Sequence, residues 1–594
     1  MDINGSRTSR ASVAVAPVKN LRATAWAACA LVTAVALTGT LTGPAAAAPP
    51  EKGGATATAG DPVTHEENDR VPEGAAWTQH YFPSSDGSDT ELHADVLLPE
   101  KLPKGKKVPV ILSAGAYFGH SGEIYPEGFE RTGPSGRFND FIKGTDLFEQ
   151  GYAFVMVDTR GFGGSTGCLD FGGPGDQADV KAAIDWSAKQ PWSTGAVGMY
   201  GKSFDAYTGL IGNNLDQDAL KAVVAQEPVW DAQRHLQSNG LFRPNAVLTA
   251  QTYNGIALNP QLPDDDKRYL ANSRYEEKHP ECLTENAAGY RIADPADPYW
   301  TSRSPAKKAK GTDTPLFFTQ GFIEDNTKGE GMREFLDNHE GPQRGWVGQW
   351  EHVRGNEKTE DGRLKMGRKG WFKETMSFYD QFLKGVEPKV TYPAYAVEDS
   401  TGTWRAEKTW PAEDRTASLR LGGGSYVDDG ASAKPGSKTT GSGFLVRSEP
   451  VGRPTRVTGT PRIAMTAEGE GNVMVKLYDV AKDGTAVMFD EQVSRLDSDR
   501  LDLELKSTDW TLAAGHALAV EIGSVRTGDW LDTPSKQKIT IKDARLELAL
   551  DDPAGDIATG GDRSPYLDTY LGLYTVELPA GEASFTLPPA RDRG

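Results

Sequence analysis

The sequence has only three cysteines in 594 residues, and none of them forms a C-x-x-C pair. Its nine histidines are scattered rather than clustered, so the spacing typical of a zinc site is missing, and we predict neither a metal nor a cofactor. Cys29 lies in an N-terminal apolar stretch, which leaves Cys168 and Cys282 in the rest of the chain. Two remaining thiols in an oxidising compartment favour a disulfide between them, and two free or buried thiols are the alternative.

The 64 lysines and arginines are outnumbered by 83 aspartates and glutamates, and long apolar runs are scarce. The formal net charge is −19, which would repel phosphates, so nucleic acid is not expected as a partner. Beyond residue 48 no stretch is apolar enough to span a bilayer, and no membrane contact is predicted for the mature chain. The length indicates two or three globular domains, but nothing in the sequence indicates an oligomeric state.

The N-terminus has the layout of an export signal. Basic residues precede the apolar run ATAWAACALVTAVAL, and the small residues of a cleavage site follow in GPAAAAPP. We predict a signal peptide over residues 1–48, cleaved near Ala47 or Ala48, and therefore a secreted protein; a membrane anchor is the alternative. Residues 49–72, rich in Ala, Gly, Pro and Thr, are expected to form a flexible leader.

Two regions of different periodicity follow the leader. Residues 73–390 begin with a predicted hairpin and then alternate short apolar runs, such as VPVILSAG and TPLFFTQGF, with helical stretches such as DQADVKAAIDWSAKQ. This alternation predicts a parallel sheet covered on both faces, interrupted at about residues 228–310 by a helical cap insertion. Residues 391–594 lose helical periodicity and predict an all-β sandwich of the jelly-roll type.

Ser203 stands at a predicted strand-to-helix corner, in the stretch GMYGKSFDAYTGL. Such a corner can hold a nucleophilic hydroxyl above the sheet, with the next backbone N–H facing the developing oxyanion. A helix N-cap is the ordinary alternative, because serine favours that position. The usual G-x-S-x-G pattern is incomplete, since Asp205 occupies the position of its last glycine.

A nucleophilic serine needs a base and an acid, which follow it in chain order in this type of fold. His352 comes directly after the apolar run RGWVGQW, where parallel sheets keep their functional loops, although it could be an isolated surface histidine. Glu324 and Asp325 both follow the preceding strand, and either could orient the imidazole. Tyr117, in the loop after the first long strand, could donate its phenol to the oxyanion or pack as an aromatic wall.

Four stretches together resemble a known family. VMVDTRGFGGSTG, DVKAAIDWSAKQPWSTGAVGMYGKS, GFIEDNTK and GQWEH look like those of the X-prolyl dipeptidyl-peptidase and cocaine-esterase-like serine hydrolases, in the family's order, over roughly residues 77–390. The resemblance extends into the β region, because the family carries a C-terminal jelly-roll domain. It implies an α/β-hydrolase core with a helical cap and a jelly-roll domain.

The same resemblance implies roles for single residues. Ser203 would be the nucleophile, His352 the base, and Tyr117 with the N–H of Phe204 the oxyanion donors. The family's acid stands three residues after the strand-end glycine, a position that is Glu324 here, although the family usually has aspartate there. A shift of one residue in the loop would select Asp325 instead. The family also usually has glycine where Ala206 stands.

The substrate is expected to be a peptide or a small ester. Removal of an N-terminal dipeptide needs a carboxylate for the substrate's α-ammonium group, and Glu227 and Asp231 lie at the expected cap entrance, although both could be ordinary loop acids. The resemblance favours an X-prolyl dipeptidyl-peptidase, with a carboxylesterase of the cocaine-esterase type as the alternative. A non-catalytic binding protein is the remote alternative, because it would not need a serine, an acid and a histidine in this order.

Overall fold

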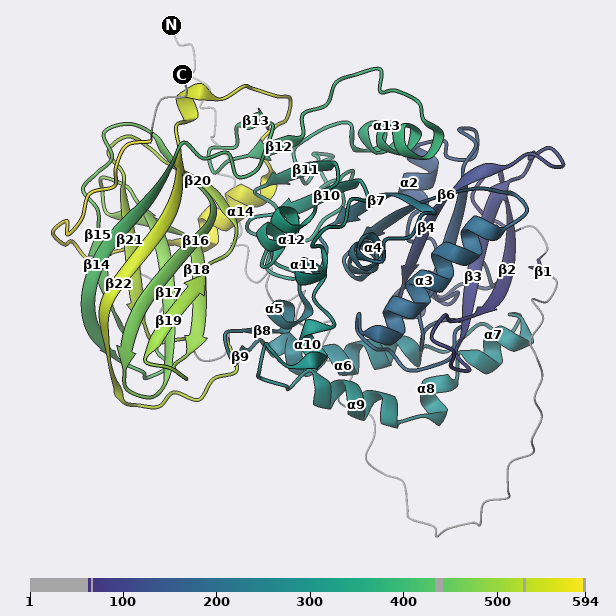
Figure 1. Ribbon diagram of the computed structural model, residues 1–594, viewed down its shortest axis with the longest axis horizontal. Coiled ribbons are helices and arrows are strands. Elements are labelled where there is room, and N and C mark those ends of the chain that lie inside the picture. The colour runs from purple at the N-terminus through teal and green to yellow at the C-terminus, as the bar shows by residue number, and fades with distance from the viewer. Residues whose placement is uncertain (1–61, 66–67, 433–441, 527–529, 591–594) are drawn as a thin grey trace, which may run out of the picture. The chain divides into compact units, whose positions relative to one another are not determined.

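The computed structural model describes residues 62–65, 68–432, 442–526 and 530–590, all within one compact unit that spans residues 59–594 (Figure 1). The predicted signal peptide, residues 1–48, and most of the predicted leader lie outside the described residues. Part of the leader is ordered, because Val63–Thr64 forms strand β1 and pairs with the hairpin that follows. No helix in the described ranges is long and apolar enough to cross a membrane.

An eleven-stranded sheet forms the centre of the first region, with the order β1-β2-β3-β5-β4-β6-β7-β10-β11-β12-β13. Its strands after β1 are β2 (Ala75–Pro83), β3 (Glu91–Pro99), β4 (Val108–Gly115), β5 (Ala153–Asp158), β6 (Ser193–Lys202), β7 (Leu220–Gln226), β10 (Leu316–Gly321), β11 (Gln343–Gly348), β12 (Tyr395–Glu398) and β13 (Trp404–Glu407). The strands from β5 to β12 pair in parallel, and β2 and β3 form the predicted antiparallel hairpin.

Helices cover both faces of this sheet (Figure 1). Helices α3 (Pro174–Lys189) and α4 (Phe204–Asn214) pack on one face, and α2 (Asn139–Gly144) and α13 (Trp371–Lys384) pack on the other. Every residue of β4, β5 and β10 is buried, since both of their faces are covered. This arrangement confirms the predicted α/β core.

The cap insertion is confirmed as a mainly helical segment after β7. It contains α5 (Ala232–Leu236), the short strands β8 (Gln237–Ser238) and β9 (Leu241–Phe242), α6 (Pro244–Ala257), α7 (Lys267–Asn272), α8 (Tyr275–Lys278), α9 (Glu281–Gly289), α10 (Pro298–Thr301) and α11 (Pro305–Lys308). Cys282 of α9 forms a disulfide with Cys168 of the loop after β5, as predicted, and links residues that are 114 positions apart.

We expect this disulfide to contribute strongly to stability, because it closes a long loop between the cap and the core. Loss of a native bridge of this span costs about 2–5 kcal/mol. Replacement of both cysteines, Cys168→Ser with Cys282→Ser, should therefore lower the midpoint of guanidinium unfolding, whereas Thr391→Ala in an exposed loop should not. An unchanged midpoint in the double variant would show that packing alone holds the cap.

The second region is a sandwich of two antiparallel five-stranded sheets around its own apolar core. Their strands are β14 (Arg415–Val427), β15 (Gly443–Arg447), β16 (Thr455–Glu468), β17 (Asn472–Val480), β18 (Thr485–Arg495), β19 (Arg500–Glu504), β20 (Thr508–Leu512), β21 (Ala517–Gly523), β22 (Lys538–Asp551) and β23 (Thr575–Glu577). One helix, α14 (Pro565–Tyr574), interrupts the expected all-β pattern. The predicted jelly-roll class is confirmed.

Two strands after the predicted boundary at residue 391 still pair with the central sheet. Strands β12 and β13 continue the central sheet to Glu407, and the sandwich begins with β14 at Arg415. The two regions are also joined by side chains: Arg405 of β13 makes two hydrogen bonds, of 2.9 and 2.7 Å, to the Asp509 carboxylate of β20. Ile323, in the loop after β10, belongs to the apolar core of the sandwich. The sandwich therefore packs against the loop at the carboxyl end of β10.

Candidate active site

Ser203 lies between the end of β6 and the start of α4 in a strained conformation. Its φ and ψ are 66° and −121°, a region that non-glycine residues seldom adopt. A Cβ at Gly201 would lie 2.2 Å from the carbonyl oxygen of Asp205, so only glycine fits the inside of this turn. The Ser203 side chain makes no capping hydrogen bond to α4, which disfavours the N-cap alternative and favours an exposed nucleophile.

Asp205, which breaks the G-x-S-x-G pattern, has a specific buried place. Its carboxylate accepts a hydrogen bond from Nε of Arg137, and a Cβ at Gly115 would lie 1.9 Å from its Oδ1. Arg137 also donates to the Lys202 carbonyl (3.1 Å), and its guanidinium lies 4.2 Å from the centre of the Tyr117 ring. Arg137 therefore connects the serine turn to the expected oxyanion tyrosine, a role that no sequence motif indicated.

Glu324 and His352 come together from the loops after β10 and β11. The Nδ1 of His352 lies 3.2 Å from Oε1 of Glu324, an ion-pair contact that falls short of ideal hydrogen-bond geometry. Glu324 is fully buried, and its oxygens accept from the backbone N–H groups of Asn326 (2.8 Å), Thr327 (3.0 Å) and Lys328 (2.5 Å). Burial opposes ionisation, but His352 and these donors outweigh it and lower the pKa of Glu324 to about 2.

Asp325 points away from this pair. Its side chain is 67% exposed and lies 3.6 Å from Nη2 of Arg243 in the cap. Of the two acids that sequence left open, the geometry therefore favours Glu324 as the partner of His352.

Tyr117 and Phe204 lie side by side, with ring centroids 6.5 Å apart. Phe204 is the first residue of α4, so its backbone N–H has no partner within the helix and is free to face an oxyanion. The Tyr117 hydroxyl lies 2.9 Å from the hydroxyl of Tyr253 in cap helix α6. The Tyr117 hydroxyl thus contacts a polar group of the cap, so Tyr117 does not serve only as an apolar packing residue.

Burial, together with a neighbouring cation, keeps the His352 imidazole neutral. Burial, followed by the Lys202 ammonium, lowers the pKa of His352 below its usual value. The pKa of Lys202 is itself lowered to about 8 by burial and by Arg137 and Arg354. A neutral imidazole at pH 7 is the form that a general base requires.

Removal of the Lys202 charge should move the acid limb of the pH–rate profile. In Lys202→Met the imidazolium of His352 loses a neighbouring cation, so the pKa of His352 rises and the limb of kcat/KM shifts to higher pH. Lys181→Met, on the exposed face of α3, is the matched control and should leave the limb in place. A limb that is unchanged, or that moves to lower pH in Lys202→Met, would contradict this electrostatic assignment.

Glu227 and Asp231, expected at the cap entrance, are both engaged within the fold. Glu227 is fully buried and accepts from Thr319 Oγ1, Gln320 Nε2, the Gly321 N–H and Trp350 Nε1 at 2.8–3.3 Å. Asp231 caps α5 through the Arg234 N–H (3.0 Å) and accepts from Ser304 Oγ (2.5 Å). These contacts leave little capacity for a substrate ammonium and favour the interpretation as structural acids.

Two family models match the chain. The one described as X-Pro dipeptidyl-peptidase (S15 family) matches residues 86–354, and the one described as X-Pro dipeptidyl-peptidase C-terminal non-catalytic domain matches residues 387–556. The first match contains Tyr117, Ser203, Glu324 and His352, and the second covers most of the sandwich.

Individual proteins are similar over much of the chain. A "Putative Xaa-Pro dipeptidyl-peptidase" of Streptomyces avermitilis is 23% identical over 597 residues, which cover 85% of this chain and 83% of that protein. The "Cocaine esterase" of a Rhodococcus species is 25% identical over 315 residues, 45% of this chain and 51% of the esterase. A crystal structure of an aminopeptidase from a marine sediment archaeon of the Thaumarchaeota has the same fold. It superposes with a TM-score of 0.60 at 18% identity, and the match covers 83% of this chain and 99% of the aminopeptidase.

Proposed function

Because the chain belongs to the S15 family of X-Pro dipeptidyl-peptidases, which are serine hydrolases, we propose that it removes dipeptides with a penultimate proline from the N-termini of peptides. The observation that carries this proposal is the strained Ser203 turn after β6. In the same sheet, the loops after β10 and β11 bring His352 to a buried, ionised Glu324.

In the first half of the reaction, Ser203 Oγ attacks the carbonyl carbon of the proline residue. His352 takes the hydroxyl proton as the C–O bond forms, and the imidazolium is stabilised by the Glu324 carboxylate. The carbonyl oxygen becomes an oxyanion that accepts hydrogen bonds from the Tyr117 hydroxyl and the Phe204 N–H. His352 then returns the proton to the leaving amine, the C–N bond breaks, and the dipeptide remains as an ester of Ser203.

In the second half, water replaces the leaving amine. His352 removes a proton from water, the resulting hydroxide attacks the ester carbonyl, and the same two donors hold the second oxyanion. Collapse of this intermediate returns the proton to Ser203 and releases the dipeptide acid.

The test is a paired rate measurement on an Ala-Pro amide and on a simple aryl ester without an amino group. We expect a higher kcat/KM for the Ala-Pro amide, and loss of that preference when its α-amino group is acetylated. Equal rates for the free and the acetylated amide would contradict an exopeptidase.

A carboxylesterase is the second candidate, and the similarity to the Rhodococcus cocaine esterase is the observation that favours it. The chemical steps are the same, with an alcohol as leaving group. Rapid turnover of the aryl ester, together with no measurable cleavage of the amide, would select this function.

We also propose that the protein is exported, as the predicted signal over residues 1–48 indicates. The Cys168–Cys282 disulfide supports this, because such bridges persist in oxidising compartments. N-terminal sequencing of protein from the culture medium should give a chain that starts near Ala48, and a chain found only inside cells would contradict export.

A further inference from the structure

A second cluster of histidines and carboxylates lies outside the candidate active site. His93 and Asp95 are two residues apart on β3 and therefore share a face, Gln79 pairs opposite Asp95 on β2, and His120 comes from the loop after β4. All four side chains are at most 1% exposed. The chain thus gathers two imidazoles, a carboxylate and an amide oxygen in its buried interior.

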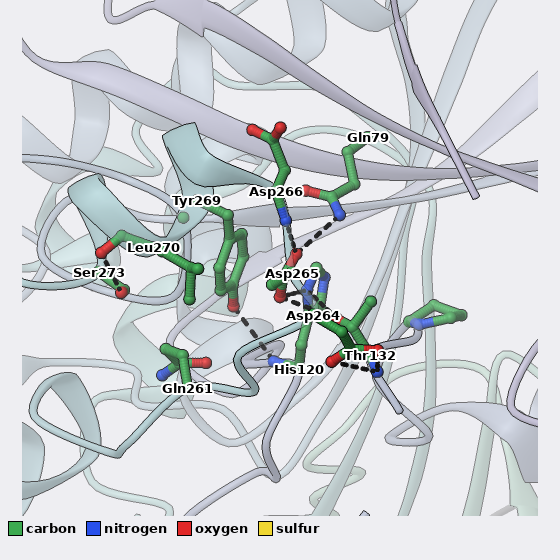
Figure 2. A network of polar contacts seen from close by, with 12 residues as sticks. Gln79, His120, Thr132, Gln261, Asp264, Asp265, Asp266, Tyr269, Leu270 and Ser273 are labelled. Atoms are coloured by element: carbon green, nitrogen blue, oxygen red, sulfur yellow. Dashed lines mark hydrogen bonds and ion pairs between the residues drawn. The ribbon is translucent and has the colours of Figure 1, made fainter. Parts of the chain in front are cut away.

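The two imidazoles are oriented in the same way. The Nδ1 of His93 lies 2.8 Å from Oδ2 of Asp158, and the Nδ1 of His120 lies 2.6 Å from Oδ2 of Asp265. Each carboxylate fixes the ring and leaves Nε2 directed toward the centre of the cluster, the arrangement that protein metal sites use for ligating histidines. Figure 2 shows His120 held by Asp265, beside Thr132 and Tyr269, with Gln79 also donating to Asp265.

The two Nε2 atoms face oxygens rather than donors. His120 Nε2 lies 3.0 Å from Oδ2 of Asp95, and His93 Nε2 lies 3.1 Å from Oε1 of Gln79 and 3.9 Å from Oδ1 of Asp95. Asp95 and Gln79 are themselves held, by the Trp77 N–H at 2.7 Å and by Asp265 at 3.0 Å. The Nε2 atoms of both histidines and the side-chain oxygens of Asp95 and Gln79 therefore converge. Each of these four side chains also has a hydrogen-bond partner outside the cluster centre.

The cluster carries negative charge that either a bound metal ion or protonated imidazoles of His93 and His120 would compensate. Asp95, Asp158 and Asp265 are buried, and among the described residues no lysine or arginine forms an ion pair with any of them. The buried acids near the sandwich differ, because Arg405 and Arg456 pair with Asp509 and Asp551. Buried carboxylates are costly without a compensating charge.

We propose that His93, Asp95, His120 and Gln79 bind one divalent transition-metal ion, with Zn²⁺ as the expected ion. Imidazole and carboxylate ligands suit Zn²⁺, whose bonds of about 2.0–2.1 Å place tetrahedral ligand atoms roughly 3.4 Å apart. The nitrogen and oxygen atoms of His93, Asp95 and His120 lie within 4.8 Å of one another, so small side-chain rotations close the site. The absence of a histidine cluster in the sequence did not exclude it, because the ligands come from three separate segments.

The position of this site gives it a structural role near the catalytic groups. His120 lies three residues after Tyr117, and Asp265 and Tyr269 belong to the cap around helix α7. A metal ion on His120 would join the loop of the expected oxyanion tyrosine to the hairpin and, through Asp265, to the cap. The ion has no place in the acyl-transfer steps, so its removal should affect stability more directly than chemistry.

The test measures metal binding by the full-length mature protein. We expect about one Zn²⁺ per chain after loading with ZnCl₂ and gel filtration, and visible d–d bands of a four-coordinate, nitrogen-containing site when Co²⁺ replaces it. Chelation should lower the unfolding midpoint. Asp158→Asn alters the outer partner of His93, an oxygen that also accepts from the Gly164 N–H (3.0 Å), and should weaken Zn²⁺ affinity about 10–100-fold.

The controls separate this site from surface histidines and from a metal-free cluster. His516→Gln removes a histidine that pairs with Asp479 in the sandwich at 2.7 Å, and it should leave the stoichiometry unchanged. The double variant Asp95→Asn with His120→Gln should lose the Co²⁺ bands, with folding checked by circular dichroism. Wild-type protein that binds no stoichiometric Zn²⁺, or nitrogen NMR showing both imidazoles doubly protonated in excess Zn²⁺, would overturn the proposal and leave two imidazolium ions as the compensating charge.

Discussion

Ser203→Ala should abolish acyl-enzyme formation. The strained turn holds this hydroxyl at the start of α4, and it is the hydroxyl that attacks the substrate carbonyl in the proposed mechanism. Removal of the serine of a catalytic triad lowers kcat by about 10⁶-fold in subtilisin, and we expect a loss of that order here. Labelling with a fluorophosphonate probe, followed by mass spectrometry of the modified peptide, measures the change directly.

The control for this experiment is Ser85→Ala, an exposed serine on the β2–β3 hairpin, which should label like the wild type. Circular dichroism of Ser203→Ala should match the wild type, because loss of the hydroxyl does not remove any buried contact. A folded Ser203→Ala protein that still labels fully would identify another nucleophile and remove the basis of the proposed mechanism.

The sheet and its functional loops were predictable because they depend on repeated local patterns. Continuous apolar runs such as residues 108–115 and 316–321 are required wherever parallel strands are buried on both faces. Strands β12 and β13 escaped this reasoning, since four residues carry no measurable period and follow the last helix of the region. Helix α14 was missed for a similar reason, as it is a single helix within a long β pattern.

Pairs of distant side chains were not predictable from local patterns. From the sequence, Asp205 only breaks the serine motif. In the structure its carboxylate accepts a hydrogen bond from Arg137, 68 residues away in the chain. Glu227 and Asp231 looked available for a substrate amine, yet their partners Trp350 and Ser304 come from other segments of the chain. The Cys168–Cys282 pair was predictable only because no other cysteines remain after the N-terminal segment.

Glu324→Gln should lower kcat strongly, whereas Asp325→Asn should have a mild effect. Glu324 is the acid that contacts His352 Nδ1, and its charge stabilises the imidazolium that forms when Ser203 attacks. An amide at this position removes that charge and lets the imidazole adopt the wrong tautomer, a change that costs about 10⁴-fold in trypsin-type enzymes. Asp325 is 67% exposed and faces Arg243, so its charge acts on the cap rather than on His352.

The two variants form a matched pair, because each converts one carboxylate to the isosteric amide in the same loop. Single-turnover rates on an activated ester separate the acylation step from product release. In Glu324→Gln the new amide nitrogen would face backbone N–H donors that the Glu324 oxygens accept from, so unfolding midpoints must accompany the rates. A large loss of kcat in Asp325→Asn beside a near-normal Glu324→Gln would show that the acid loop shifts by one residue when substrate is bound, and that the family's aspartate position corresponds to Asp325.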